Sequence, residues 1–299
     1  MSKNVKVASL LVTLMLGGTN IRMIQENAIA NQGRETLPAP SESVSIDICA
    51  NTNTFSQMNV SSEDTQVEQG YAEAQRRIQS ARETQATILD LGYLNLTRLP
   101  SEIGQLTNLK ILKLTTNKLR SLPVVIGQLT NLEHLELSDN QLSSLPVEIG
   151  QLTHLKNIQI VKNKLSSLPS EIGQLTNLQY LGLADNQLRS LPIEIGQLTS
   201  LQELVLTQNQ LRHLPVEIGQ LTNLQTLVLI KNQLRSLPSQ TGQLKSLKEL
   251  FLECNQLRRL PSELWQLLQL DLQYVGIMNN LVPPQRLETY NEKLEGTSK

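Results

Sequence analysis

The stretch LPSEIGQLTNLKILKLTTNKLRS, residues Leu99 to Ser121, decides the fold because the chain repeats it with few changes. Seven copies of this 23-residue run follow one another from Leu99 to Arg259. A fixed period of this length is typical of a solenoid, in which each copy forms one coil that buries its apolar side chains against the next coil. The repeat therefore predicts a stack of coils rather than a globular core.

Each copy contains the pattern L-x-x-L-x-L-x-x-N-x-L. Its first occurrence is formed by Leu109, Leu112, Leu114, Asn117 and Leu119. Successive side chains of a strand point to opposite faces, so Leu112 and Leu114 face inward while Lys113 between them faces outward. Because one strand cannot bury these leucines alone, the copies must stack, and we expect a parallel sheet of about eight strands.

An asparagine occupies the same position in every copy. The column consists of Asn117, Asn140, Asn163, Asn186, Asn209, Asn232 and Asn255. A side-chain amide can both donate and accept hydrogen bonds, so it can satisfy backbone groups of its own coil and of the next one. We interpret this column as structural and assign it no catalytic role.

The second half of each copy returns the chain to the next strand. A Leu-Pro pair such as Leu99-Pro100 disfavours helix at the leucine. Ile103 and Leu106 then point inward, and Gly104 allows a close approach of neighbouring coils. We expect a short helical or 3₁₀ turn here, not a full helix.

The combined pattern LPxxIGxLxxLxxLxLxxNxL resembles the leucine-rich repeat, and its 23-residue length resembles the Ras-group type, over about residues 66–284. The resemblance implies an α/β solenoid: a curved leucine-rich-repeat horseshoe with a concave parallel β-sheet, a helical N-terminal cap and a degenerate C-terminal cap. It also implies a bacterial source.

The expected organisation has six parts: a signal peptide at 1–30, a disordered linker at 31–65, an N-terminal helical cap and half-repeat at 66–98, seven leucine-rich repeats at 99–259, a C-terminal capping repeat at 260–284, and a polar tail at 285–299. Apolar residues at helical spacing from Val67 to Ala81 predict the cap helix. Near the other end, Asn279 and Leu281 read as the last Asn-x-Leu pair before Pro283-Pro284.

The N-terminus carries a possible export signal. Lys3 and Lys6 precede an uncharged run, Val7 to Gly18, which is too short to span a bilayer. A small-x-small cleavage site follows at Ala28-Ile29-Ala30, although charged residues lie between it and the run. The pattern favours export to the periplasm, cell surface or extracellular space, with a cytoplasmic leader as the alternative.

Composition narrows the function classes. With 26 basic and 27 acidic residues, the chain has a net charge of −1, which does not indicate the basic surface that nucleic-acid binding requires. The two cysteines, Cys49 and Cys254, suggest no disulfide framework. We expect no cofactor, no metal site, no integral membrane segment and no catalytic residue. His134, Ser138 and Asp139 have the residue types of a hydrolase triad, but they come from one coil and cannot form a relay. The expected state is a monomer.

Recognition is expected where the copies differ on the outward side of the strands. From the fifth strand of the repeat array onward these positions become apolar, with Val205, Val228, Ile230 and Phe251 expected to form an exposed strip rimmed by glutamates. Exposed apolar patches with a polar rim mark interaction sites, although β-branched residues also simply suit strands. The candidate partner-binding residues are Tyr180, Glu203, Val205, Thr207, Thr226, Val228, Ile230, Glu249, Phe251 and Glu253.

The leading hypothesis is a non-enzymatic module, exported from a bacterium, that binds a protein partner of unknown identity through the concave sheet. Two alternatives stay open. One is an intracellular scaffold or regulator of Ras-like GTPases, which rests on fold analogy alone. The other is a secreted effector with ubiquitin-ligase-like activity, although few residues and no cysteine follow the last full repeat.

Overall fold

The computed structural model describes residues 62–264, 267, 274–277 and 279–282. The chain divides into two compact units, Met1–Ser62 and Glu63–Lys299, and the second contains all the described residues except Ser62. The expectations for the signal peptide, for most of the linker and for the polar tail lie outside the described residues. No helix among the described residues is long and apolar enough to cross a membrane.

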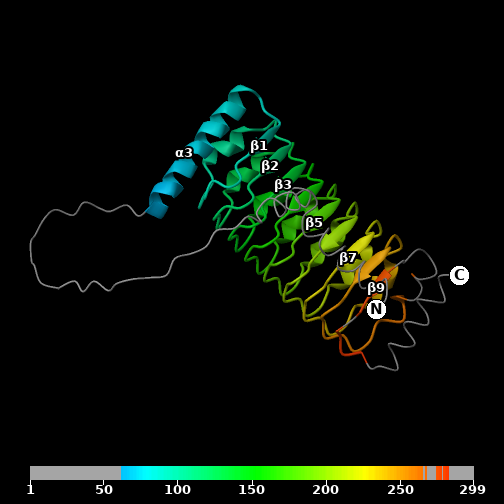
Figure 1. The fold of residues 1–299 in the computed structure, drawn as a ribbon. Helices are drawn as coiled ribbons and strands as arrows, with labels where there is room; N and C mark the ends of the chain where they lie inside the picture. The colour runs from blue at the N-terminus through cyan, green and yellow to red at the C-terminus, as the bar shows by residue number, and fades with distance from the viewer. Residues whose placement is uncertain (1–61, 265–266, 268–273, 278, 283–299) are drawn as a thin grey trace, which may run out of the picture. The chain divides into compact units, whose positions relative to one another are not determined.

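Nine short parallel strands form one sheet in the described part of the chain, in the order of the sequence (Figure 1). They are β1 (Ile88–Asp90), β2 (Ile111–Lys113), β3 (His134–Glu136), β4 (Asn157–Gln159), β5 (Tyr180–Gly182), β6 (Glu203–Val205), β7 (Thr226–Val228), β8 (Glu249–Phe251) and β9 (Tyr274–Gly276). Each residue pairs with the residue 23 positions further on from β1 to β8, so the sequence columns are columns in space.

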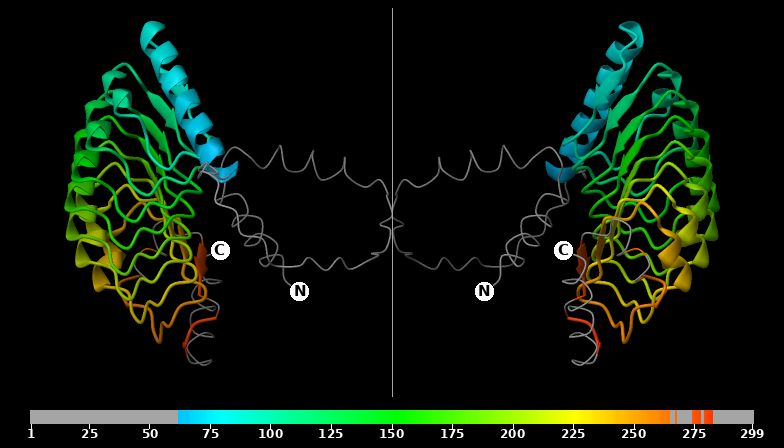
Figure 2. Two further views of the ribbon diagram at one scale, coloured as in Figure 1. Left: turned by 90° about the vertical axis from the view of Figure 1, so that its left-hand side faces the viewer. Right: turned by 90° about the vertical axis from the view of Figure 1, so that its right-hand side faces the viewer.

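The return halves form 3₁₀ turns, as the Leu-Pro pairs and the glycine predict. These are η1 (Ser101–Gln105), η2 (Val124–Gln128), η3 (Val147–Gln151), η4 (Ser170–Gln174), η5 (Ile193–Gln197), η6 (Val216–Gln220) and η7 (Ser239–Gln243). They stack along the side of the solenoid opposite to the strands (Figure 2). The glycine is required there because a Cβ on Gly196 would lie 2.7 Å from the carbonyl oxygen of Glu217 in the next coil.

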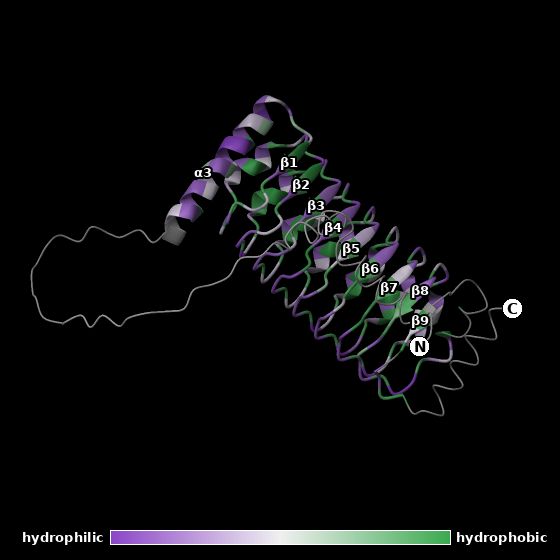
Figure 3. Ribbon diagram, in the orientation of Figure 1, coloured by the Kyte–Doolittle hydropathy of each residue, from purple (hydrophilic) through white to green (hydrophobic). Residues whose placement is uncertain are grey.

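The core fills the space between strands and 3₁₀ turns, and it consists of the leucines and isoleucines of the pattern. Leu112, Leu114, Ile103 and their equivalents are buried in one continuous apolar cluster from coil to coil. In Figure 3, apolar green segments recur along the strands and turns and alternate with hydrophilic ones, beside a mostly hydrophilic α3. The fold is therefore the predicted solenoid with a parallel sheet.

The asparagine column joins the coils by hydrogen bonds. The Asn186 side chain donates from Nδ2 to the carbonyls of Ile160 (2.7 Å) and Leu183 (3.1 Å), and its Oδ1 accepts from the Leu165 N–H (3.0 Å). Asn209 of the next coil also donates to the Leu183 carbonyl, at 2.9 Å. Because carbonyls such as this one are shared by two asparagines, the ladder links consecutive coils.

The helix α3 (Ser62–Glu83) packs against the first coil. It begins five residues before Val67, where the apolar spacing starts. Ala74, Ile78 and Ala81 are buried in the core cluster, and a Cβ at Gly70 would collide with the Leu94 carbonyl. The apolar face of the helix thus covers leucines that a terminal coil would otherwise expose.

The last coil differs from the expectation in its register. Asn280, not Asn279, continues the ladder: its Nδ2 donates to the Leu252 carbonyl at 2.8 Å, and its Oδ1 accepts from the Leu257 N–H at 3.0 Å. Asn279 instead adopts a positive φ of 58°. The reason is length, because Phe251 pairs with Gly276 and this coil therefore has 25 residues instead of 23.

Candidate partner-binding surface

The face of the sheet that points away from the core, called here the concave face, carries three columns of outward side chains. In β5 to β8 the first column is Tyr180, Glu203, Thr226 and Glu249, and the second is Gly182, Val205, Val228 and Phe251. The third column lies two residues beyond the second and contains Thr207, Ile230 and Glu253. The sheet thus places all ten candidate residues on adjacent coils.

The apolar strip is buried, so the expectation that it is exposed is wrong. Val205 and Phe251 are 2% exposed, Val228 is 3% exposed and Ile230 is 9% exposed. None of the four belongs to the core cluster of leucines. Their outward side chains lie side by side on coils about 4.8 Å apart. They form an apolar layer separate from the core.

The accessible part of the surface is its polar rim. Glu203 is exposed, and Tyr180, Thr207, Glu249 and Glu253 are half-buried, while Thr226 is buried between the two glutamates of its column. A partner would therefore meet the first column before it meets the strip.

Tyr180 lies along β5 over Gly182. A Cβ at Gly182 would be 2.8 Å from the Tyr180 Cε1 atom and 3.0 Å from its hydroxyl oxygen. The missing side chain at Gly182 is what allows the ring to lie against the sheet. Burial raises the pKa of the Tyr180 phenol above its ordinary value, and the neighbouring carboxylate of Glu203 raises it further. Gly182 is not among the candidate residues predicted from the sequence.

Glu203 and Glu249 flank Thr226 from either side. The Thr226 hydroxyl donates to Oε2 of Glu249 at 3.3 Å. Burial raises the pKa of Glu203 above its ordinary value, and the like charge of Glu249 adds to the rise. Both effects disfavour the ionised form of Glu203.

The strands before β5 carry ion pairs. In the second column, Lys113 of β2 pairs with Glu136 of β3 at 3.9 Å. Outside the three columns, directly before the strands, Glu133 lies between Lys110 (3.1 Å) and Lys156 (2.6 Å), and its hydrogen bonds to Lys156 and then to Lys110 lower its pKa to about 2. Lys162 pairs with Asp139 one residue beyond the third column. The first half of the concave face therefore carries an ion pair where the second half carries an apolar layer.

A second apolar set lies on the 3₁₀ side and was missed from the sequence. Val124, Val147, Ile193 and Val216 directly follow the Leu-Pro pairs and are 52–62% exposed. The sequence does contain a signal for this set, because the position after the Leu-Pro pair varies between an apolar residue and serine. The serines are Ser101, Ser170 and Ser239. The set is split at Ser170, so it forms two pairs rather than one continuous strip.

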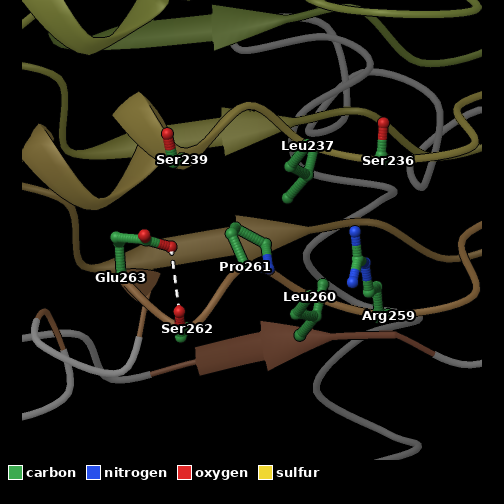
Figure 4. A pocket seen from close by; sticks show the side chains of 8 residues that line it. All are labelled: Ser236, Leu237, Ser239, Arg259, Leu260, Pro261, Ser262 and Glu263. Atoms are coloured by element: carbon green, nitrogen blue, oxygen red, sulfur yellow. Dashed lines mark hydrogen bonds between the residues drawn. The ribbon is translucent and has the colours of Figure 1, made fainter.

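A polar cavity lies near the C-terminal end of the described repeats. It has a volume of about 460 Å³ between the seventh and the last coil, and its lining includes Arg259, Ser239 and Glu263. Figure 4 shows the Ser262 hydroxyl donating to Glu263 at 3.1 Å, with Arg259 on the far side. Among the described residues, no group of three or more His, Cys, Asp or Glu could hold a metal ion.

Two family models match the chain. The model described as "Leucine rich repeat" matches residues 84–142, and the model described as "Leucine-rich repeat region" matches residues 126–211. Together with the sheet, the 3₁₀ turns and the asparagine ladder, these matches decide the family. The chain is a leucine-rich repeat protein.

Solved structures agree with this leucine-rich repeat assignment. A leucine-rich repeat protein of Leptospira interrogans is 40% identical with a TM-score of 0.66, and the match covers 70% of this chain and 54% of that one. A plant peptide hormone receptor, RGFR1 in complex with RGF2, is 35% identical with a TM-score of 0.59, over 66% of this chain and 33% of that one.

The leucine-rich repeat ectodomain of the Arabidopsis thaliana receptor kinase GASSHO1/SCHENGEN3, in complex with CASPARIAN STRIP INTEGRITY FACTOR 2, is 31% identical. Its TM-score is 0.53, over 65% of this chain and 27% of that one. The chain therefore spans about half of the Leptospira protein and about a third or less of the plant receptors. A comparison with curated proteins gave no match.

Proposed function

We propose that this leucine-rich repeat protein is a non-enzymatic interaction module that binds a protein partner through the concave face of β5 to β8. Leucine-rich repeat domains are typically protein-binding scaffolds, and two of the similar structures are complexes of plant receptors. The observation that carries the proposal is the division of the concave face. Only its second half combines an apolar layer outside the core with two carboxylates, Glu203 and Glu249, that form no ion pair with a described lysine or arginine.

The division of each repeat into constant and variable positions explains why the concave face is suited to recognition. The leucines, asparagines and glycines of the repeat serve stacking and leave little freedom, whereas the outward columns can change without cost to the core. Tyrosine and phenylalanine, which dominate the energetics of many interfaces, occur in the outward columns at Tyr180 and Phe251.

The test is a pair of aspartate substitutions in the full chain. Val228→Asp places a charge in the apolar layer, and Val147→Asp places one on the exposed 3₁₀ side as the matched control. After an unbiased capture experiment identifies a partner, Val228→Asp is expected to weaken its binding at least tenfold and Val147→Asp to leave it unchanged. Equal binding by both variants, with urea midpoints that show both to be folded, would refute the concave site.

We further propose that the chain is exported from a bacterial cell. The basic residues and the apolar run at the N-terminus support this, as does the similarity to the Leptospira protein. N-terminal sequencing of the mature protein tests it: a start at Asn31 is expected, and an intact Met1 would contradict export.

A further inference from the structure

Four exposed arginines occupy one position in four consecutive copies of the repeat, directly after the Asn-x-Leu of the asparagine ladder. They are Arg189, Arg212, Arg235 and Arg258, called here the arginine row. Two earlier copies have Ser143 and Ser166 at the same position, so the coil does not need arginine there. The row is therefore a feature of the surface of the last coils rather than of the scaffold.

The backbone holds the row in a line, one coil apart. Two residues before Arg212, the Gln210 N–H donates to the Leu188 carbonyl of the preceding coil at 2.9 Å, and Gln233 and Gln256 repeat this bond in the next two coils. The leucine directly before each arginine is buried in the core. At a coil spacing of about 4.8 Å, the four backbone positions span about 14 Å.

The charges of the row are not neutralised within the described part of the chain. None of the four guanidinium groups forms an ion pair or a hydrogen bond with a described residue. Like charges on neighbouring coils repel one another, so anionic groups laid along the arginines would relieve this repulsion. The row therefore favours a linear anionic ligand.

The polar cavity adjoins the C-terminal end of the row. Ser236 and Arg259 line it, and they directly follow Arg235 and Arg258 in the chain. Its volume of about 460 Å³ is in the usual range of small-molecule sites, about 300–1,000 Å³. In Figure 4, Arg259 and Glu263 lie at opposite ends of the lining. The cavity thus offers a donor to an anionic group and an acceptor to a hydroxyl group.

We propose that the arginine row and the adjoining cavity bind a sulfated polysaccharide, whose sulfate groups lie on the arginines while one sugar unit occupies the cavity. Like phosphate, a sulfate group accepts the two parallel N–H bonds that the fork of a guanidinium donates. Sugar hydroxyls both donate and accept, so they can donate to Glu263 and accept from the serines of the cavity. The site is separate from the concave face and goes beyond the proposed protein binding.

Other polyanions fit this surface less well. Single-stranded nucleic acids gain affinity by stacking bases on aromatic side chains, and no described Phe, Tyr or Trp adjoins an arginine of the row along the chain or lines the cavity. A flat membrane would also meet Glu194 and Glu217, which follow two arginines of the row in the 3₁₀ turns and repel anionic head groups. Inorganic polyphosphate has no hydroxyl groups that could donate to Glu263.

The experiment measures the binding of a fluorescein-labelled heparin dodecasaccharide to the full chain by fluorescence polarisation, at a physiological ionic strength of about 0.15 M. Unlabelled heparin is compared as a competitor with desulfated heparin, inorganic polyphosphate and oligothymidylate. We expect heparin to compete about tenfold better than each of the others, which corresponds to about 1.4 kcal/mol.

Two double variants with the same loss of charge locate the site. Arg212→Ser with Arg235→Ser introduces the residue that two earlier copies carry there, and it is expected to weaken heparin binding about tenfold, or about 1.4 kcal/mol. Lys231→Gln with Lys245→Thr is the matched control, because both lysines are exposed outside the row and the preceding copy has glutamine and threonine at these positions. It is expected to leave binding unchanged.

The single variant Arg259→Ser tests the cavity, and it is expected to weaken heparin binding severalfold. The preceding copy has Ser236 at the same position, so the substitution is compatible with the coil. Urea midpoints close to that of the parent confirm that all variants are folded.

Equal weakening by the two double variants, or equal competition by all the polyanions, would show charge attraction without a site and would overturn the proposal. Stronger competition by oligothymidylate would assign the row to nucleic acid instead, and binding to phosphatidylglycerol vesicles without binding to heparin would assign it to a membrane. Unchanged binding by Arg259→Ser would refute the place of a sugar unit in the cavity. None of the substituted residues lies on the concave face, so these results are independent of the proposed protein binding.

Discussion

Substitution of Asn186 tests whether the asparagine ladder holds the coils together. Replacing it with leucine fills similar space but removes every hydrogen bond of the side chain. The Leu183 carbonyl keeps the bond from Asn209, but the Leu165 N–H and the Ile160 carbonyl, which bond to Asn186 among the described residues, become unsatisfied in a buried position. Each such group costs about 1–3 kcal/mol, so we expect a loss of about 2–6 kcal/mol.

The assay is urea unfolding of the full chain followed by far-ultraviolet circular dichroism. Asn177→Leu is the matched control, because Asn177 is exposed and its single bond to the Thr153 carbonyl, at 2.9 Å, can be replaced by water; its cost is expected to be about 0.5 kcal/mol. A loss for Asn186→Leu no larger than that of the control would refute the structural role of the ladder.

The isosteric substitution Asn186→Asp tests the donor role of the Asn186 amide independently, through the pH dependence of stability. A buried carboxylate facing the Ile160 and Leu183 carbonyls cannot donate, so its pKa in the folded state is raised above the unfolded value of about 3.9. The penalty is absent below the unfolded pKa and grows as the pH rises toward the folded pKa. Asn186→Asp is therefore expected to be closer to the parent in stability at pH 3.5 than at pH 7 (both chosen as roughly bracketing that value), and a pH-independent difference would contradict this.

Three further predictions concern other parts of the coil. Thr116 is a β-branched residue at a φ of 55°, so Thr116→Asn is expected to stabilise the chain by about 1 kcal/mol in urea unfolding, while Asp139→Asn at the equivalent position changes little. Gly196→Ala places a Cβ against the carbonyl of the next coil and is expected to cost about 1–3 kcal/mol, more than Gly92→Ala, where the nearest atoms are at 3.1 Å; equal costs would contradict the close approach. Glu133 is expected to titrate in the folded state with a pKa of about 2. Because this pKa lies below its ordinary value, its stabilising contribution is present above that value and is lost as the pH falls through 2; a midpoint near 4.3 by NMR would contradict the two lysine contacts.

The repeat was sufficient to predict the coils, the 3₁₀ turns and the core, because each of these depends on residues that recur in every copy. Leu112 and Leu114 are inward in the structure for the reason that alternation predicts. The outer columns could be aligned from the sequence as well, since a constant 23-residue period fixes the register that pairs Val205 with Val228 and Phe251.

The features that were not predicted depend on contacts outside one copy. Phe251 is buried although its column points away from the core cluster, and the periodic pattern does not predict that burial. The Tyr180 ring lies over Gly182 because Gly182 has no side chain, and a hydrophobic pattern does not report the absence of a side chain. Asn280 replaced Asn279 in the ladder because two extra residues in the last coil shift the frame.

The crystal structure of the full chain with a partner identified by capture tests the central claim most directly. The account predicts that the partner lies on the concave face of β5 to β8, in contact with Tyr180, Glu203 and Glu249. A partner bound on the 3₁₀ side near Val147 or Ile193, or on strands β2 to β4, would contradict it.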